Sequence, residues 1–155
     1  MNLYIMRHGM AEPYHAKPDA ERLLVPEGET QALSVATQWK QSSPSLDYII
    51  ASPYKRAQKT AQIVMETLVF SGELLTNPLV TPDGKVLEVA KSLDQFSPAD
   101  ILLVSHMPLV SDLLAYLTSG DGRSYGGLMT AQLVHLRGEH IAQGCMDVEQ
   151  ILYPE

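Results

Sequence analysis

The sequence predicts an α/β fold: a single-domain, three-layer sandwich with a mostly parallel central sheet, helices on both faces and antiparallel edge strands near the C-terminus. Short apolar runs at residues 3–6, 48–51 and 101–104 do not alternate with polar residues, which is typical of strands buried on both faces. Longer segments with apolar residues at helical spacing separate these runs. The length suits one domain, which we expect to span residues 1–155.

The first half of the chain predicts strand, helix, strand, helix. After the strand at 3–6, the segment 27–41 places apolar residues on one helical face. The strand at 48–51 is followed by a predicted helix over 53–68 with the same spacing. Pro53 suits the first turn of this helix, because a backbone N–H at that position has no partner within the helix.

The second half continues the pattern around the strand at 101–104. Residues 86–93 and 109–117 have helical spacing, and Pro108 is placed to open the second of these helices. The run Thr81–Gly84 has a proline and a glycine where a type I turn favours them.

Near the C-terminus the pattern changes from alternating helices and strands to two strands. Residues 132–136 and 146–152 read as strands, and the glycine-containing segment 137–144 connects them. We expect them to form an antiparallel pair at the edge of the sheet.

Composition points to a soluble protein of a reducing compartment. The chain has 11 Lys and Arg and 18 Asp and Glu, a net charge of −7, which disfavours nucleic acid or an anionic membrane as partner. Cys145 is the only cysteine, so no intrachain disulfide can form. No apolar run is long enough to span a bilayer, and the N-terminus does not resemble a signal peptide. We expect a cytoplasmic monomer.

Polar side chains follow three of the predicted strands. Arg7 and His8, with Gly9, come directly after the first strand. Arg56 lies at the start of the helix after the second strand, and His106 follows the strand at 101–104. Because ligands bind beyond the carboxyl ends of strands in open parallel sheets, we expect these side chains to meet at one edge.

Such a cluster has the chemistry of a phosphoryl site. Arginine presents forked, permanently charged donors to phosphate oxygens, and two helix N-termini open at the same edge. A neutral imidazole can attack phosphorus and become phosphorylated. The nearby acidic residues Glu12 and Asp112 are not spaced as a metal-binding set, so we expect neither metal nor cofactor.

Three motifs resemble those of the histidine phosphatase superfamily. Met6–Gly9 is similar to its Arg-His-Gly signature, Ser52–Ala61 to its Ser-Pro-x-x-Arg-Ala-x-x-Thr motif, and Val104–Pro108 to its third motif. Their order, each at a predicted strand end, makes the resemblance specific. The short chain, Ala11 and the Ser-His-x-Pro-Leu-Val run at 105–110 resemble the SixA-type phosphohistidine phosphatases.

The resemblance implies a role for each residue. His8 would be the nucleophile that forms a phosphohistidine intermediate, which water then hydrolyses. Arg7, Arg56 and a protonated His106 would hold the phosphoryl oxygens, and Gly9 would join them in binding substrate. His8 must be neutral to attack, and the neighbouring arginines would lower its pKa.

The resemblance also implies a protein substrate, a histidine-phosphotransfer domain of a bacterial sensor kinase in a two-component phosphorelay. Leu79–Thr81 stands where larger relatives carry a general acid, and Ala11 and Tyr14 replace their Ser and Asn. An imidazole leaves a P–N bond more readily than an alkoxide leaves phosphorus, so a missing acid favours phosphohistidine. Little length remains for a lid beyond 13–26 and 119–127.

Two alternatives stay open at this stage. If Glu12, Asp83 or Glu88 reaches the site as an acid, a phosphatase or mutase acting on small phosphate monoesters becomes plausible. From a different class, the chain could be a phosphoprotein-binding module without catalysis.

The remaining polar residues of note are expected to be structural. His15 lies in a predicted loop, His135 on a strand and His140 in a turn, away from the strand ends. Ser52 and Ser105 are expected to cap helices rather than to attack substrate.

Overall fold

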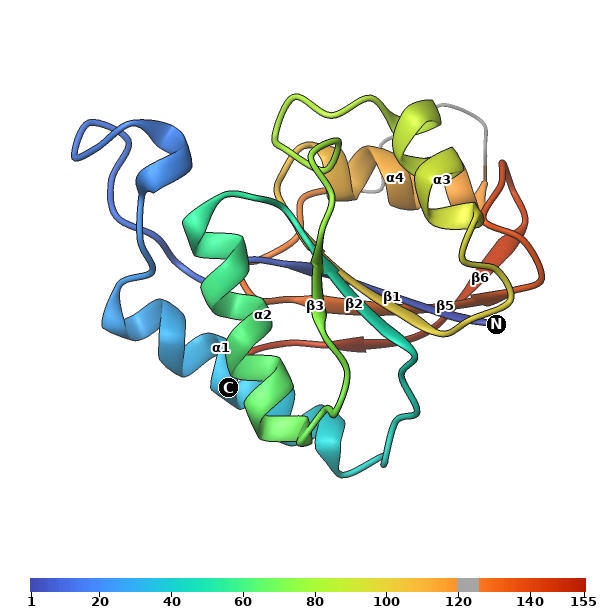
Figure 1. The fold of residues 1–155 in the computed structure, drawn as a ribbon, viewed down its shortest axis with the longest axis horizontal. Helices are drawn as coiled ribbons and strands as arrows, with labels where there is room; N and C mark the ends of the chain where they lie inside the picture. The colour runs from blue at the N-terminus through green and yellow to red at the C-terminus, as the bar shows by residue number, and fades with distance from the viewer. Residues whose placement is uncertain (120–125) are drawn as a thin grey trace.

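The computed structural model describes residues 1–119 and 126–155, in which a six-stranded sheet lies between two layers of helices (Figure 1). In chain order the elements are β1 (Asn2–Arg7), the 3-10 helix η1 (Asp19–Glu21), α1 (Pro26–Lys40), β2 (Tyr48–Ala51), α2 (Lys55–Leu68), β3 (Leu74–Thr76), α3 (Val86–Asp94), β4 (Ile101–Ser105), α4 (Leu109–Thr118), β5 (Leu133–Gly138) and β6 (Met146–Leu152). In this part of the chain no helix is long and apolar enough to cross a membrane.

The strand order is β3-β2-β4-β1-β5-β6. The first four strands are parallel, whereas β5 pairs antiparallel with both β1 and β6. The turn predicted at 81–84 is present, with the Gly84 N–H donating to the Thr81 carbonyl at 2.9 Å. The predicted fold class, a mostly parallel sheet with an antiparallel pair at its C-terminal edge, is therefore confirmed.

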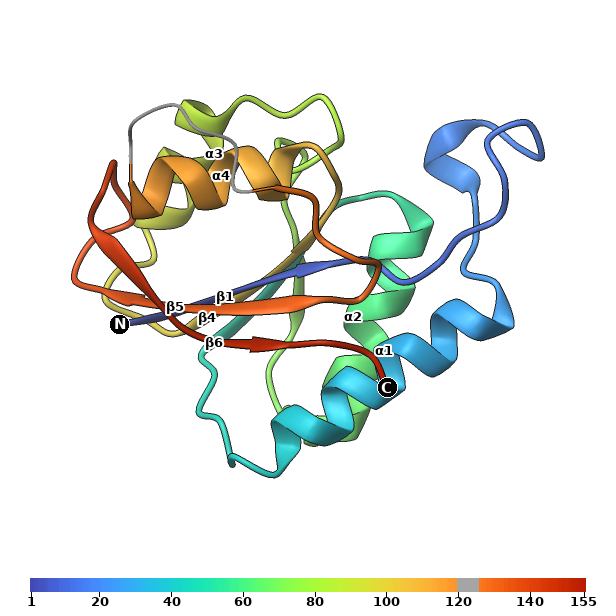
Figure 2. The ribbon, with the colours of Figure 1, turned by 180° about the vertical axis from the view of Figure 1, so that it is seen from behind.

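The helices cover both faces of the sheet, with α1 and α2 on one side and α3 and α4 on the other (Figure 2). Along β1, Tyr4 and Met6 pack in the cluster under α1 and α2, and Leu3 and Ile5 in the cluster under α3 and α4. Burying a side chain of this size contributes about 1.5–3 kcal/mol, so both faces of the strand favour apolar residues. This explains why the sequence shows no alternation.

The parallel register brings three strand ends into line. Arg7 pairs with Ser105 across β1 and β4, and Ala51 pairs with Val104 across β2 and β4. The His8 N–H continues this pairing by donating to the Ser105 carbonyl at 3.1 Å. The residues that follow these strands therefore leave the sheet at one edge.

Some element boundaries differ from the prediction. The strand β3 was not predicted, because three residues are too few to show a periodicity. Helix α2 begins after Tyr54, whose backbone is extended (φ −68°, ψ 139°), so Pro53 lies outside the helix. Pro108 is the N-cap of α4 and precedes its first turn. The predicted placement of both prolines in a first turn is wrong, because the chain turns before each helix begins.

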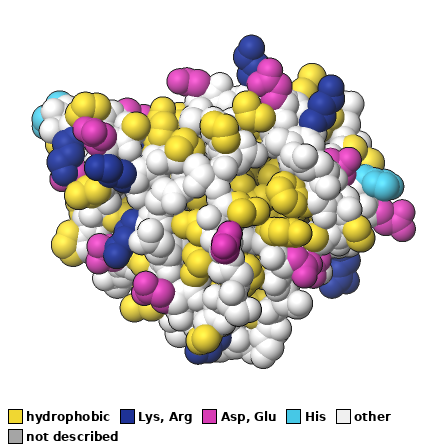
Figure 3. All heavy atoms as spheres, viewed as in Figure 1, with side chains coloured by type: hydrophobic (Ala, Val, Ile, Leu, Met, Phe, Trp, Pro, Cys, Tyr) yellow, Lys and Arg dark blue, Asp and Glu magenta, His cyan; other side chains and the backbone are white. Residues whose placement is uncertain are grey.

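Apolar side chains also gather on the surface beside β3 and α3 (Figure 3). They line a groove of about 440 Å³, which includes Leu75, Leu79 and Phe96. The groove lies along the edge strand and does not include the residues predicted at the strand ends.

Two glycines allow the segment after β1 to pack closely against the start of α1. A Cβ atom on Gly9 would lie 2.4 Å from the Gly28 carbonyl oxygen, and one on Gly28 would lie 2.0 Å from the Met10 oxygen. The Val25 N–H donates to the same Met10 oxygen at 3.1 Å. Backbone thus packs directly on backbone here, and the absence of side chains on both glycines sets how His8 leaves the sheet.

We expect the Gly28→Ala variant to be destabilised by about 2 kcal/mol, because a new methyl group would overlap a backbone oxygen. This loss would occur although alanine favours helix formation over glycine. Urea unfolding measures the change. The control is Gly127→Ala, where an added Cβ meets no atom within 4 Å; equal stability of the two variants would contradict the close approach.

Candidate active site

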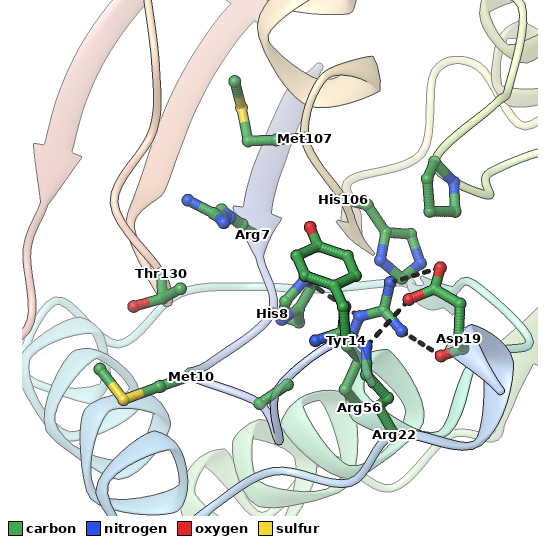
Figure 4. A pocket seen from close by; sticks show the side chains of 12 residues that line it. Arg7, His8, Met10, Tyr14, Asp19, Arg22, Arg56, His106, Met107 and Thr130 are labelled. Carbon is green, nitrogen blue, oxygen red and sulfur yellow. Dashed lines mark hydrogen bonds and ion pairs between the residues drawn. The ribbon is translucent and has the colours of Figure 1, made fainter. Parts of the chain in front are cut away.

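The four side chains predicted at the strand ends line one cavity of about 260 Å³ (Figure 4). Arg7 and His8 come from the end of β1, Arg56 from the first turn of α2, and His106 from the residue after β4. The complete lining consists of Arg7, His8, Met10, Ala11, Tyr14, Asp19, Arg22, Arg56, Pro82, His106, Met107 and Thr130. The structure thus brings together residues that lie almost 100 positions apart in the chain.

The His8 ring is held by a hydrogen bond at each nitrogen. Its Nδ1 lies 2.6 Å from the Gly9 carbonyl oxygen, and its Nε2 lies 3.3 Å from the Arg56 Nε. A carbonyl accepts and a guanidinium N–H donates, so the proton belongs on Nδ1 and the lone pair on Nε2. The ring is 6% exposed. His8 therefore presents Nε2 as a nucleophilic atom in an orientation fixed by the backbone.

Gly9, which we predicted among the substrate-binding residues, does not line the cavity. Its N–H donates to the Thr60 hydroxyl at 3.1 Å, and Thr60 in turn donates to the Arg56 carbonyl at 2.8 Å. Its expected part in substrate binding stays a prediction, while its carbonyl orients His8 and its lack of a side chain makes room for α1.

The second histidine of the cavity, His106, has a hydrogen-bond partner at one ring nitrogen. His106 Nε2 lies 2.7 Å from the Ser52 hydroxyl, which also accepts the Tyr54 N–H at 3.1 Å. The Ser105 hydroxyl donates to the Val80 carbonyl at 2.7 Å. Neither serine caps a helix, so that prediction is wrong; each hydroxyl instead ties a strand end to its surroundings.

Two buried nitrogen atoms in the lining have no hydrogen-bond partner among the described residues: Arg7 Nε and His106 Nδ1. A second Arg7 nitrogen, Nη1, donates to the Leu128 carbonyl at 2.7 Å, so the guanidinium is held in place. An unpaired buried donor costs about 1–3 kcal/mol. A ligand with acceptor oxygens in the cavity would pair with Arg7 Nε, and with His106 Nδ1 in the tautomer or charged form that carries a proton there, which suits an oxyanion.

The segment between β1 and α1 adds an arginine and a carboxylate that the sequence analysis did not predict. Arg22 is 6% exposed, and its Nε donates to Asp19 Oδ1 at 2.9 Å. Arg56 donates to the Asp19 carbonyl oxygen at 2.5 Å, and its Nη2 lies 3.3 Å from Asp19 Oδ2. A buried arginine in a loop rich in polar residues leaves little signal in a sequence. The second segment considered for a lid, 119–127, lies partly outside the described residues, which exclude 120–125.

The carboxylates proposed as general acids lie elsewhere. Glu12, Asp83 and Glu88 do not line the cavity, and Glu12 instead accepts the Leu23 N–H at 2.8 Å. Asp19 does line the cavity. Burial raises the pKa of its carboxyl group, but the hydrogen bonds and charges of Arg22 and Arg56 lower that pKa by more, so it lies below its ordinary value. This carboxylate is therefore ionised and unable to donate a proton near neutral pH. In the described ranges no group of three or more His, Cys, Asp or Glu is placed to hold a metal.

Both histidines of the cavity are held in the neutral form. Burial, with the charges of Arg56 and Arg7, lowers the pKa of His8 to about 3. Burial, followed by His8 and then Arg56, lowers the pKa of His106 to about 2. The ring centroids lie 5.1 Å apart. A bound dianion would reverse the balance at His106 by adding two negative charges beside it.

The other histidines do not enter the site. His135 Nε2 lies 2.7 Å from the Asn2 side-chain oxygen, and the ring stacks on Tyr4 at 4.3 Å between centroids, a structural role as predicted. His15 and His140 are exposed and do not line the cavity.

Comparison with known proteins agrees with this geometry. A model of the histidine phosphatase superfamily (branch 1) matches residues 3–75. The chain is 32% identical over 124 residues to phosphohistidine phosphatase SixA of Escherichia coli strain K12, covering 78% of this chain and 76% of that protein. It is 35% identical over 127 residues to the SixA homolog of Haemophilus influenzae, covering 76% and 77%.

A solved structure shares the whole fold. The structure of the protein histidine phosphatase SixA complexed with tungstate superposes with a TM-score of 0.89 at 27% identity, covering 99% of this chain and 97% of that one. The chain therefore belongs to the histidine phosphatase superfamily, and it is a hydrolase of the phosphatase class. Within that superfamily it is of the SixA type.

The depressed histidine pKa values predict that the protein loses stability in mild acid. Histidine in the unfolded chain titrates near pH 6.5. Below that pH the unfolded state therefore binds protons that the buried His8 and His106 of the folded state do not bind. The free energy of unfolding is therefore unaffected by protonation of these two histidines above pH 6.5. Below pH 6.5 it falls by about 1.4 kcal/mol for each histidine and pH unit, toward pH 3.

Urea unfolding at pH 7.5 and 5.5 tests this prediction. The His106→Gln variant should show a smaller loss between the two pH values than the wild type, whereas His15→Gln, at an exposed position, should match the wild type. A wild-type stability that is the same at both pH values would refute the buried neutral histidines.

Proposed function

We propose that this protein is a phosphohistidine phosphatase that acts on a histidine-phosphotransfer domain of a signalling kinase, through a covalent intermediate on His8. One observation carries the proposal: the cavity combines a neutral nucleophile with several fixed cations, and the carboxylate in its lining is ionised. Such a site can bind and attack a phosphoryl group, but among the residues that the structure describes it has no acid for a poor leaving group.

In the first step, the Nε2 lone pair of His8 attacks phosphorus in line with the bond that breaks. A new P–N bond forms to His8, and the electron pair of the old P–N bond returns to the substrate ring nitrogen. Arg56, whose Nε–H bonds to the His8 Nε2 lone pair in the free protein, would release it and donate to the phosphoryl oxygens instead. Arg7 Nε and His106 Nδ1, both unpaired in the described residues, would donate to the same oxygens.

In the second step, water attacks the phosphorus of phospho-His8. The P–N bond to His8 breaks, its electron pair returns to Nε2, and inorganic phosphate leaves. The Gly9 carbonyl keeps the Nδ1 proton in place during both steps, so the ring returns to its starting tautomer.

The leaving group favours a P–N substrate over a phosphate ester. An imidazole whose second nitrogen is protonated leaves as a neutral molecule with a conjugate-acid pKa of about 6.5, whereas an alkoxide needs a proton donor. Asp19 cannot serve as that donor, because two arginines hold it ionised.

The mouth of the cavity supports a protein as substrate. Tyr14 at the mouth is 80% exposed, so a histidine side chain projecting from a partner could reach Nε2. Two relatives are named phosphohistidine phosphatase SixA and phosphohistidine phosphatase SixA homolog, and one SixA structure holds tungstate, a tetrahedral oxyanion. We further propose a role in a two-component phosphorelay, which would place the protein in the bacterial cytoplasm. There it would act as a monomer with one domain over residues 1–155.

A substrate panel tests the function. The wild type should release phosphate from phosphoramidate and from a phosphorylated histidine-phosphotransfer domain far faster than from glycerate or sugar monophosphates. His8→Asn should release none and form no acid-labile phosphoenzyme, because no lone pair remains to attack. Faster turnover of the monophosphates would contradict the proposal.

Arg56 and its neighbour Lys55 offer a matched pair of variants. Arg56→Ala should lower kcat/KM for phosphoramidate by about 10²–10³, because a charged donor to the transition state is lost. Lys55→Ala removes an exposed cation outside the cavity and should change the rate little at physiological salt. A similar rate loss in both variants would show that Arg56 acts through general charge rather than contact.

A further inference from the structure

Tyr14 stands at the mouth of the cavity and has no part in the steps described above. Its side chain is 80% exposed, yet it is among the residues that line the cavity. In the view of Figure 4 its ring overlaps His8, and the Arg56 guanidinium is drawn to one side of the ring. A large exposed aromatic ring at the opening of a charged cavity has an unfavourable hydration free energy that contact with a substrate would relieve.

The Tyr14 ring rests on a fixed support. The Arg22 guanidinium carbon lies over the ring, 4.1 Å from its centroid. Arg22 is itself held by Asp19 Oδ1 at 2.9 Å and by the Glu12 carbonyl oxygen at 2.5 Å. One face of the ring is thus backed by a cation that cannot easily move, and the exposed remainder of the ring is available to a ligand.

In-line transfer places the leaving group on the same side as Tyr14. His8 is 6% exposed and Tyr14 is 80% exposed although both line the cavity, so Tyr14 lies nearer its opening. Arg7, Arg56 and His106 line the same cavity and would hold the phosphoryl group in the proposed reaction. The leaving atom must lie opposite the attacking nitrogen, and hence toward the mouth. A leaving imidazole would therefore emerge beside the Tyr14 ring.

We propose that Tyr14 is a specificity-determining residue, whose ring stacks on the imidazole leaving group of a phosphohistidine substrate while Arg22 supports it from behind. The inference rests on the proposed function and adds a contact to the leaving ring. The atoms balance as before: the His8–phosphorus bond forms, the bond from phosphorus to the substrate ring breaks, and its electron pair stays on that ring. Stacking on Tyr14 lowers the activation free energy only for substrates whose leaving group contains an aromatic ring.

Two small P–N compounds isolate this contact, since they differ in whether the leaving group has a ring. N-phosphorylimidazole releases imidazole, and phosphoramidate releases ammonia. We expect Tyr14→Leu to lower kcat/KM for N-phosphorylimidazole by about three- to tenfold, the range for one aromatic pair, and to leave that for phosphoramidate unchanged. Tyr14→Phe should restore the wild-type ratio of the two values, because it keeps the ring.

The control is His15→Ala, which removes an exposed ring from the same loop but outside the cavity, and should leave both values unchanged. Equal losses for the two compounds in Tyr14→Leu would overturn the inference, and so would a Tyr14→Phe variant as impaired as Tyr14→Leu. A loss confined to a phosphorylated protein substrate would overturn it too, in favour of a contact with the partner's surface. A wild type that hydrolyses neither compound would instead refute the proposed function.

Discussion

The active site depends on a single carboxylate that holds two guanidinium groups together. Arg22 and Arg56 both bond to Asp19, and Arg7 lines the same cavity. Three cations in so small a space repel one another, and burial makes that repulsion costly. The Asp19 carboxylate offsets part of the charge and leaves the rest uncompensated. In a protein with a net charge of −7, this produces a local cationic site that can attract a phosphoryl dianion.

The same uncompensated charge helps to set the protonation state of His8 and His106. Burial and the neighbouring arginines hold the pKa of His8 far below neutrality, so a lone pair is available without any general base. The pKa of His106 is also far below its ordinary value, and its Nδ1 has no partner in the part of the chain that the structure describes. A dianion would favour the protonated form of His106, which donates from both nitrogens.

The fold supplies the rigidity that this arrangement needs. The paired ends of β1, β4 and β2 place His8, His106 and the start of α2 side by side, and each strand end is fixed by ladder hydrogen bonds. The approach of Gly28 to the backbone after His8 prevents that segment from moving without unpacking α1. The loop carrying Tyr14 and Arg22 is less deeply packed and reaches the site through polar contacts with Glu12 and Asp19. His8 and His106 thus lie at the ends of sheet strands, whereas Tyr14 and Arg22 lie on a loop.

The sequence by itself determined the layers and pointed to four residues that line the cavity, because both leave local patterns: unbroken apolar runs such as 101–104, and motifs such as Arg7-His8-Gly9 directly at strand ends. It also indicated the missing acid, since no carboxylate follows Leu79 at the expected place. Only the tertiary structure decided that Asp19 and Arg22 join the site, that Ser52 bonds to His106, and that the Gly9 N–H bonds to Thr60. These roles depend on contacts between residues far apart in the chain, whose side chains could equally have faced solvent, and no local pattern encodes which of them the fold brings together.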